Sequence, residues 1–111
     1  MIPKIIETER LILRPPQNSD AYQIAQRITH DVAHWLARMP YPYSRADAVD
    51  WLSAMQKYPD KAVWAITLDG QYIGSIGLER EFGYWLAQDR WGQGLMSEAG
   101  RAVLDAYFSN P

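Results

Sequence analysis

The sequence predicts an α+β domain in which helices pack against a mainly antiparallel sheet. Two β-rich runs, 62–68 and 71–78, flank Asp69-Gly70, a dipeptide typical of tight hairpins because both turn residues take positive φ. Apolar side chains recur at helical spacing between residues 95 and 107. Two further helical segments precede the hairpin, so the expected order is β-α-α-β-β-β-α. A length of 111 residues allows a single domain over residues 1–111.

The first strand is expected over residues 10–14, with Leu11 and Leu13 on its buried face. Two prolines follow and end it, because proline cannot donate to a sheet ladder. Asn18 or Ser19 is then expected to cap the first helix. The apolar positions of that helix are Ala21, Ile24, Ala25 and Ile28.

The second helix is predicted from Ser44, which forms a capping box with Asp47 three residues later, and it ends at Pro59. A further strand is expected over residues 82–86. The last helix has its apolar stripe at Leu95, Ala99, Ala102, Val103, Ala106 and Tyr107.

Some conspicuous side chains are expected to be structural. Trp51 and Trp64 are predicted to fill the core, as most tryptophans in small domains do. Arg14 with Asp20 is interpreted as a surface ion pair, which contributes little stability.

The composition narrows the possible functions. A formal net charge of −2 does not indicate the excess of basic residues that is typical of nucleic-acid-binding domains. The chain has no cysteine, which excludes disulfides, thiolate metal sites and a cysteine nucleophile. His30 and His34 could share one helix face, but no third metal ligand is apparent, so a solvated face is favoured over a metal site. No segment resembles a signal peptide or a membrane span, and we expect a soluble cytoplasmic protein.

The most informative stretch covers residues 81–99, a short strand, a glycine-rich turn and the start of an amphipathic helix. Helix starts expose unpaired N–H groups and attract phosphate-like anions. Gly92 and Gly94 would let the main chain approach such an anion closely. A plain strand-to-helix turn remains the alternative. Neither the P-loop nor the dinucleotide fingerprint fits, because no Gly-Lys-Ser/Thr follows and Met96 stands near the third glycine position.

Three segments together resemble the GNAT superfamily of acyl-CoA-dependent N-acetyltransferases, and most of all its ribosomal-protein N-terminal acetyltransferase branch. Residues 7–15, beginning Glu-Thr-Glu-Arg-Leu, are similar to the first strand of that branch. Residues 64–78 are similar to its second and third strands, and residues 81–99 to its fourth strand and pyrophosphate loop. The resemblance covers residues 7–108 and implies a GNAT-type fold.

The resemblance also implies acetyl-CoA as the co-substrate, with no metal. Main-chain groups of Tyr84, Trp85 and Leu86 are then expected to bond the pantetheine arm. The pyrophosphate loop would comprise Trp91, Gly92, Gln93, Gly94, Leu95, Met96 and Ser97. The amides of Gln93, Gly94, Leu95 and Met96 are expected to hold the pyrophosphate. Only Gly94 matches the usual loop pattern of the family strictly.

Acetyl transfer requires a neutral amine, so a base near the acetyl carbon helps. Glu81 is the candidate, because it matches the acidic residue before Gly-Tyr in this branch; the alternative is a solvated residue at a strand end. Glu79 and Glu98 are weaker candidates, and Glu98 equally suits the helix dipole or a packing-face hydrogen bond. The acceptor groove is expected at Trp35, Tyr41 and Tyr43.

The chain stops after the helix that follows the loop, whereas the resembling domains continue with more sheet. We therefore expect an acetyltransferase-like domain truncated at this point, with an open strand edge that a second copy of the chain could cover. The charged link over residues 78–82 is shorter than in the branch, which indicates a deletion or an omitted segment. The expected activity is direct transfer of acetyl to a protein N-terminus or a small amine. The alternative is a non-catalytic module that binds CoA or a partner.

Overall fold

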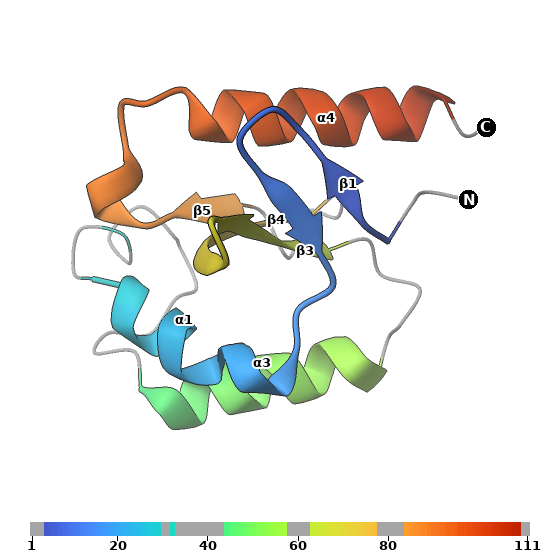
Figure 1. Cartoon of the computed structure of the whole chain (residues 1–111). Coiled ribbons are helices and arrows are strands. Elements are labelled where there is room, and N and C mark those ends of the chain that lie inside the picture. Colours follow the sequence, from blue (N-terminus) through green and yellow to red (C-terminus); the bar gives the residue numbers. More distant parts are fainter. Residues whose placement is uncertain (1–3, 30–31, 33–43, 58–62, 78–83, 110–111) are drawn as a thin grey trace.

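The structure is a computed structural model that describes residues 4–29, 32, 44–57, 63–77 and 84–109. A five-stranded sheet forms the middle of three layers (Figure 1). Its strands are β1 (Ile6–Glu7), β2 (Ile12–Arg14), β3 (Val63–Leu68), β4 (Gln71–Gly77) and β5 (Tyr84–Leu86). The α-helices are α1 (Ala21–Arg27), α3 (Arg45–Lys57) and α4 (Leu95–Ser109), and the 3-10 turns are η1 (Asn18–Asp20) and η2 (Gln88–Arg90).

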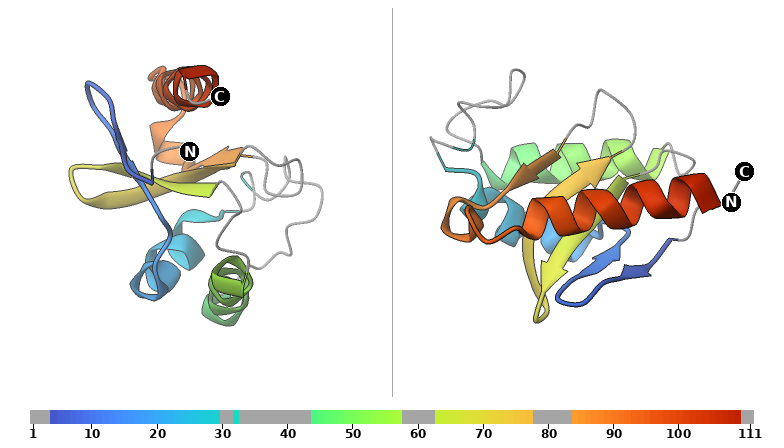
Figure 2. Two further views of the ribbon diagram at one scale, coloured as in Figure 1. Left: turned by 90° about the vertical axis from the view of Figure 1, so that its right-hand side faces the viewer. Right: turned by 90° about the horizontal axis from the view of Figure 1, so that it is seen from above.

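Helices cover both faces of the sheet: α1 and α3 lie on one face and α4 lies on the other (Figure 2). The strands follow the order β1-β2-β3-β4-β5, and every neighbouring pair is antiparallel. The predicted α+β class and antiparallel sheet are therefore confirmed.

The hairpin between β3 and β4 forms where Asp69-Gly70 predicted it. Asp69 has φ of 51° and Gly70 has φ of 81°, so both turn residues take the left-handed conformation that twists the two strands together.

The N-terminal strand differs from the prediction, because residues 10–14 do not form one strand. Two short strands, β1 and β2, enclose a turn in which the Thr8 amide donates to the Leu11 carbonyl at 2.9 Å. The Thr8 hydroxyl also accepts from the Leu11 amide at 3.0 Å, a local bond that competes with a continued ladder. Arg10 consequently lies in the turn, while Leu11 and Leu13 are buried as expected.

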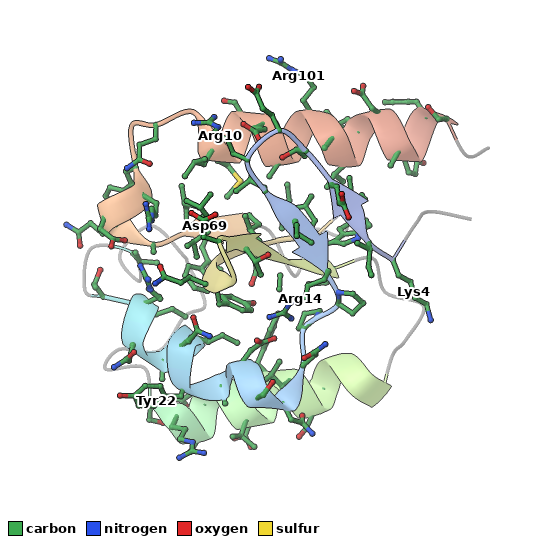
Figure 3. The ribbon with its side chains drawn as sticks, in the orientation of Figure 1. Lys4, Arg10, Arg14, Tyr22, Asp69 and Arg101 are labelled. Carbon is green, nitrogen blue, oxygen red and sulfur yellow. The ribbon has the colours of Figure 1, made fainter. Side chains whose placement is uncertain are left out.

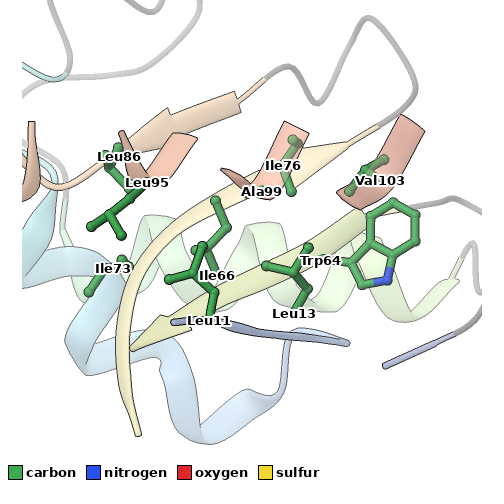
Figure 4. Packing of buried hydrophobic residues seen from close by; sticks show 10 residues of the cluster. All are labelled: Leu11, Leu13, Trp64, Ile66, Ile73, Ile76, Leu86, Leu95, Ala99 and Val103. Carbon is green, nitrogen blue, oxygen red and sulfur yellow. The ribbon is translucent and has the colours of Figure 1, made fainter. Parts of the chain in front are cut away.

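The sheet separates two hydrophobic clusters. The cluster beneath α4 contains Leu11, Leu13, Trp64, Ile66, Ile73, Ile76, Leu86, Leu95, Ala99 and Val103 (Figure 4). The cluster beneath α1 and α3 contains Ala21, Ile24, Ile28, Val32, Ala48, Leu52, Ala65, Tyr72 and Trp85. Because both faces are covered, β3 and β4 are buried nearly throughout. Trp64 is a core residue as predicted, and Trp51 is partly buried against the second cluster.

The predicted capping residues are confirmed at the start of α3 and wrong at the start of α1. At α3 the Ser44 amide donates to Asp47 at 2.9 Å and the Asp47 amide donates to the Ser44 hydroxyl at 3.1 Å, which is the predicted capping box. Before α1, neither Asn18 nor Ser19 is the cap. Both lie within η1, which begins after Gln17.

Asp20 explains that difference. Its carboxylate accepts from the Gln17 amide at 2.7 Å and from Arg14 Nη1 and Nη2 at 2.9 and 2.8 Å. The residue is only 2% exposed, so the prediction of a surface pair was wrong. A buried carboxylate needs this full set of donors, and the pair therefore fixes how the chain passes from β2 into α1.

Helix α4 packs against the sheet through Leu95, Ala99 and Val103, as its apolar stripe predicted. The stripe ends before Tyr107, which is 50% exposed and contacts Phe108 edge to face.

Candidate functional site

Strand β5 pairs with β4 along one edge only, and no other strand among the described residues covers its second edge. The Ala87 amide donates to the Ile73 carbonyl at 2.7 Å. Backbone groups alternate in direction along an antiparallel strand, so Trp85 also faces β4. The N–H and C=O groups of Tyr84 and Leu86 consequently point to the open edge. Of the three residues expected to bond a pantetheine arm, these two present their main chain outward.

Gly74 permits β5 to lie unusually close to β4. A Cβ atom at this position would be 2.3 Å from the Trp85 carbonyl oxygen and 3.1 Å from Leu86 Cα. Both are backbone atoms, so a side chain here would push the two strands apart. No local sequence pattern indicates this requirement, because it depends on the close approach of the neighbouring strand.

Trp91 reaches back to the end of β5. Its indole Nε1 donates to the Leu86 carbonyl at 2.8 Å, while the residue remains 42% exposed. A carbonyl oxygen has two lone pairs, so this bond uses half of the outward accepting capacity of Leu86. The backbone amide of Trp91 donates to the Gln88 carbonyl at 3.2 Å and is therefore not available to a ligand.

The backbone amides that follow Trp91 differ from the Trp91 amide in their hydrogen bonding. Within the described part of the chain, the N–H groups of residues 93–97 have no hydrogen-bond acceptor, and the first amide of α4 that is bonded belongs to Glu98, at 3.1 Å from the Gly94 carbonyl. Gly92 and Gly94 have φ of 78° and 75°, whereas Gln93 between them does not have positive φ. Alternation of this kind makes successive amides converge on an anion-binding concavity. The loop thus places this alternation of φ directly before the N-terminus of a 15-residue helix, a combination that suits an anion.

The glycines are required by backbone conformation. A Cβ at Gly92 would meet nothing within 4 Å, and one at Gly94 would meet only Arg10 Nη2, at 3.7 Å. The protein therefore has room for a side chain at both positions, while φ near +75° disfavours any residue with a Cβ.

Arg10 and Glu98 brace the loop from outside. Arg10 Nε donates to Glu98 Oε1 at 2.7 Å, its backbone amide donates to Oε2 at 2.9 Å, and Nη1 donates to the Gln93 carbonyl at 3.0 Å. The Thr8 hydroxyl also donates to Glu98. These bonds join residues that are 88 to 90 positions apart in the sequence. Figure 3 shows Arg10 beside the start of α4. No pattern in the sequence points to this role of Arg10 or Thr8.

Glu98 is consequently a poor candidate for the base. The hydrogen bond from Thr8, followed by that from the Arg10 amide, lowers the pKa of the Glu98 carboxyl below its ordinary value of 4.5. A carboxylate stabilised in this way resists accepting a proton. The contacts fit the predicted packing-face hydrogen bonder.

The turn before the loop is tied to the other side of the sheet. Arg27, at the end of α1, donates through Nη1 to Asp89 at 2.9 Å and through Nη2 to Gln71 at 3.3 Å. The Thr29 hydroxyl donates to Gln88 at 2.9 Å. Turn η2 is therefore held by Arg27 and Thr29, and Arg27 is itself bonded to β4.

Several predicted site residues lie outside the described residues: Glu79, Glu81, His30, His34, Trp35, Tyr41 and Tyr43. The described residues contain no group of three or more His, Cys, Asp or Glu side chains that could hold a metal ion. None of the described helices is long and apolar enough to cross a bilayer.

Comparison with known proteins agrees with this arrangement. The family model of the acetyltransferase (GNAT) domain matches residues 10–111, nearly the whole chain. The chain therefore belongs to the GNAT acetyltransferase family. No curated protein sequence matches it significantly.

Solved structures share the fold at low sequence identity. A protein assigned as a ribosomal-protein-serine acetyltransferase from Vibrio cholerae is 22% identical with a TM-score of 0.74, over 94% of this chain and 67% of its own. RimL, a ribosomal alpha-N-protein acetyltransferase, is 22% identical with a TM-score of 0.73, over 98% and 66%. The microcin self-immunity acetyltransferase MccE, in complex with acetyl-CoA and AMP, is 17% identical with a TM-score of 0.69, over 90% and 63%. The chain thus spans about two thirds of the length of these structures.

Proposed function

We propose that this chain transfers an acetyl group from acetyl-CoA to a primary amine. The observation that carries the proposal is the run of amides at residues 93–97 that have no acceptor among the described residues, together with positive φ at Gly92 and Gly94. In a GNAT domain, such a run at the N-terminus of a long helix suits the diphosphate of CoA. The related MccE structure, which contains acetyl-CoA, supports the same co-substrate.

The thiol arm would then follow the open edge of β5. Tyr84 and Leu86 direct backbone donors and acceptors to that edge, and the amide groups of a pantetheine arm can pair with such a strand edge. The loop and the strand edge are consecutive in the chain, joined by η2, so one extended molecule could contact both.

The proposed chemistry is direct transfer. The amine nitrogen attacks the thioester carbonyl carbon, a C–N bond forms, and the C–S bond breaks with its electron pair leaving on the CoA thiolate. The amine must lose a proton, and we propose Glu81 as the group that accepts it. Glu98 is unsuited to this role, because its carboxylate is already engaged by Thr8 and Arg10.

The acceptor is proposed to be a protein N-terminus or a small amine, bound near Trp35, Tyr41 and Tyr43. Two of the similar structures are described as acting on ribosomal proteins, so N-terminal peptides are the first acceptors to test. A second copy of the chain could cover the open edge of β5, and light scattering would reveal such a dimer.

Isothermal titration with acetyl-CoA tests the donor site. A Gly94→Asp variant should lose binding, because it adds a negative charge among the loop amides and a Cβ at positive φ. Gly100→Asp adds the same charge within α4, at a position where a Cβ meets nothing within 4 Å, and serves as the matched control. Absence of binding by the folded wild-type chain, or equal binding by Gly94→Asp, would contradict the proposal.

Release of free CoA thiol, measured with a panel of peptides and small amines, tests catalysis. We expect turnover with at least one amine and a large loss of kcat in Glu81→Gln with little change in acetyl-CoA binding. Binding without turnover for every amine would favour a CoA-binding module instead.

A further inference from the structure

We infer that Arg10 is a positioning residue that orients the anion-binding amides of residues 93–97; the inference rests on the proposed function of that loop. Arg10 lies in the β1–β2 turn, beside the start of α4 (Figure 3). It is far from the loop in sequence, yet Nη1 donates to the Gln93 carbonyl at 3.0 Å. This is a side-chain contact to the loop backbone from outside the loop and α4.

The contact has a geometric consequence for the next amide. In a trans peptide the carbonyl of one residue and the N–H of the next point in opposite directions. Arg10 holds the Gln93 carbonyl toward the β1–β2 turn, so the Gly94 N–H must point the opposite way, away from that turn. Glycine at position 94 makes this peptide plane easier to rotate, and the bond from Arg10 opposes that rotation.

Arg10 also controls the charge at the start of α4. Glu98 lies in the first turn of this helix, where a carboxylate would repel a bound anion. Arg10 neutralises it through two hydrogen bonds, one from Nε at 2.7 Å and one from its own amide at 2.9 Å. The Thr8 hydroxyl holds the same carboxylate. Loss of the Arg10 side chain would release the Gln93 carbonyl and leave the negative charge without its cation.

The position of Nη2, the third guanidinium nitrogen of Arg10, also supports the role of Arg10 as a positioning residue. Nη2 makes no hydrogen bond within the described part of the chain and lies 3.7 Å from the position that a Gly94 Cβ would occupy. The positive charge of Arg10 therefore lies directly beside the loop. Arginine suits this role better than lysine, because its planar fork can bond Glu98 and the Gln93 carbonyl simultaneously.

The primary test is a titration with inorganic pyrophosphate, followed through the backbone amide resonances of Gly92 and Gly94. Pyrophosphate lacks the acyl and pantetheine parts, so the result does not depend on acetyl transfer. In Arg10→Met we expect binding about tenfold weaker than in wild type, since a charge-assisted bond is lost and a charge is exposed. Arg10→Lys should fall between them. Arg101→Met, which removes an exposed arginine of α4, is the matched control and should bind like wild type.

A second measurement separates positioning from general destabilisation. Arg10→Met should weaken the binding of CoA by a similar factor while leaving the binding of acetylpantetheine, which has no diphosphate, unchanged. Equal losses for both ligands, or pyrophosphate binding within twofold of wild type, would overturn the inference. If the wild-type loop binds pyrophosphate in an Arg10-dependent way but the chain does not bind acetyl-CoA, the inference stands and the proposed acetyl-CoA site fails.

Discussion

The conformation of Gly94 gives the sharpest prediction. Its φ of 75° lies in the left-handed region, where a residue with a Cβ is less stable by about 1–2 kcal/mol than in the right-handed region. A Cβ at Gly94 would have no clash, since its nearest neighbour is 3.7 Å away. The cost of Gly94→Ala is therefore conformational strain alone.

Two terms set the size of the effect. Alanine restricts the unfolded chain and recovers about 0.4–1 kcal/mol, so the folded loop should lose roughly 1 kcal/mol if it keeps its shape. If the loop instead relaxes to negative φ, unfolding is nearly unaffected and the amides turn away from the anion. Binding must then restore the strained form, which weakens CoA affinity by about 5- to 30-fold.

The assay is urea unfolding combined with isothermal titration of CoA, performed on Gly94→Ala and Gly100→Ala. Gly100 lies within α4 and a Cβ there meets nothing within 4 Å. Alanine at position 100 should stabilise the chain by about 0.5–1 kcal/mol and leave affinity unchanged. For Gly94→Ala, the loss of unfolding free energy and the loss of CoA-binding free energy should together account for the conformational strain at position 94. The reasoning is refuted if Gly94→Ala behaves like Gly100→Ala in both measurements.

Three further predictions concern the supports of the site. Gly74→Ala should cost at least about 2 kcal/mol in urea unfolding, because its Cβ would lie 2.3 Å from the Trp85 carbonyl; a change below 0.5 kcal/mol would contradict this. Asp20→Ala should cost about 3–5 kcal/mol, since it leaves the Arg14 guanidinium without its buried partner, and a double-mutant cycle with Arg14→Met measures the coupling. The lowered pKa of Glu98 stabilises the fold above its ordinary value of 4.5, and this contribution is lost as pH falls through the lowered pKa. The stability difference between wild type and Glu98→Gln should therefore stay constant above about pH 5.5 and shrink at lower pH, and a constant difference down to about pH 3 would be inconsistent with it.

Short-range sequence patterns, namely turn dipeptides, capping residues and helical periodicity, predicted much of the fold. The Asp69-Gly70 turn and the Ser44–Asp47 box depend on residues that are adjacent or three apart, and both formed as expected. The stripe beginning at Leu95 likewise placed α4 on the sheet, because helical periodicity is a property of one segment.

The errors arose where side-chain hydrogen bonds decide the local structure, even between residues only three to six positions apart. Asp20 is buried because Arg14 and the Gln17 amide satisfy it in the folded chain, and composition cannot reveal burial of a charged pair. The β1–β2 turn is closed by Thr8, whose amide and hydroxyl both bond the backbone of Leu11. Neither feature changes the local hydrophobic pattern from which the elements were predicted.

The candidate site, like the fold, could be predicted from the local sequence only in part. Glycine spacing indicated where an anion could approach the backbone. Whether the amides there are available to an anion also depends on which hydrogen bonds the neighbouring carbonyls accept. Around the loop those carbonyls are bonded by side-chain donors: Trp91 donates to Leu86, Gln93 donates to Asp89 at 3.3 Å, and Arg10 donates to Gln93. These bonds hold the three carbonyls in place, and among the described residues none of the three accepts from an amide of residues 93–97. Side chains thus bond three carbonyls of this segment, while the amides of residues 93–97 have no acceptor among the described residues and are the donors that we propose for the diphosphate.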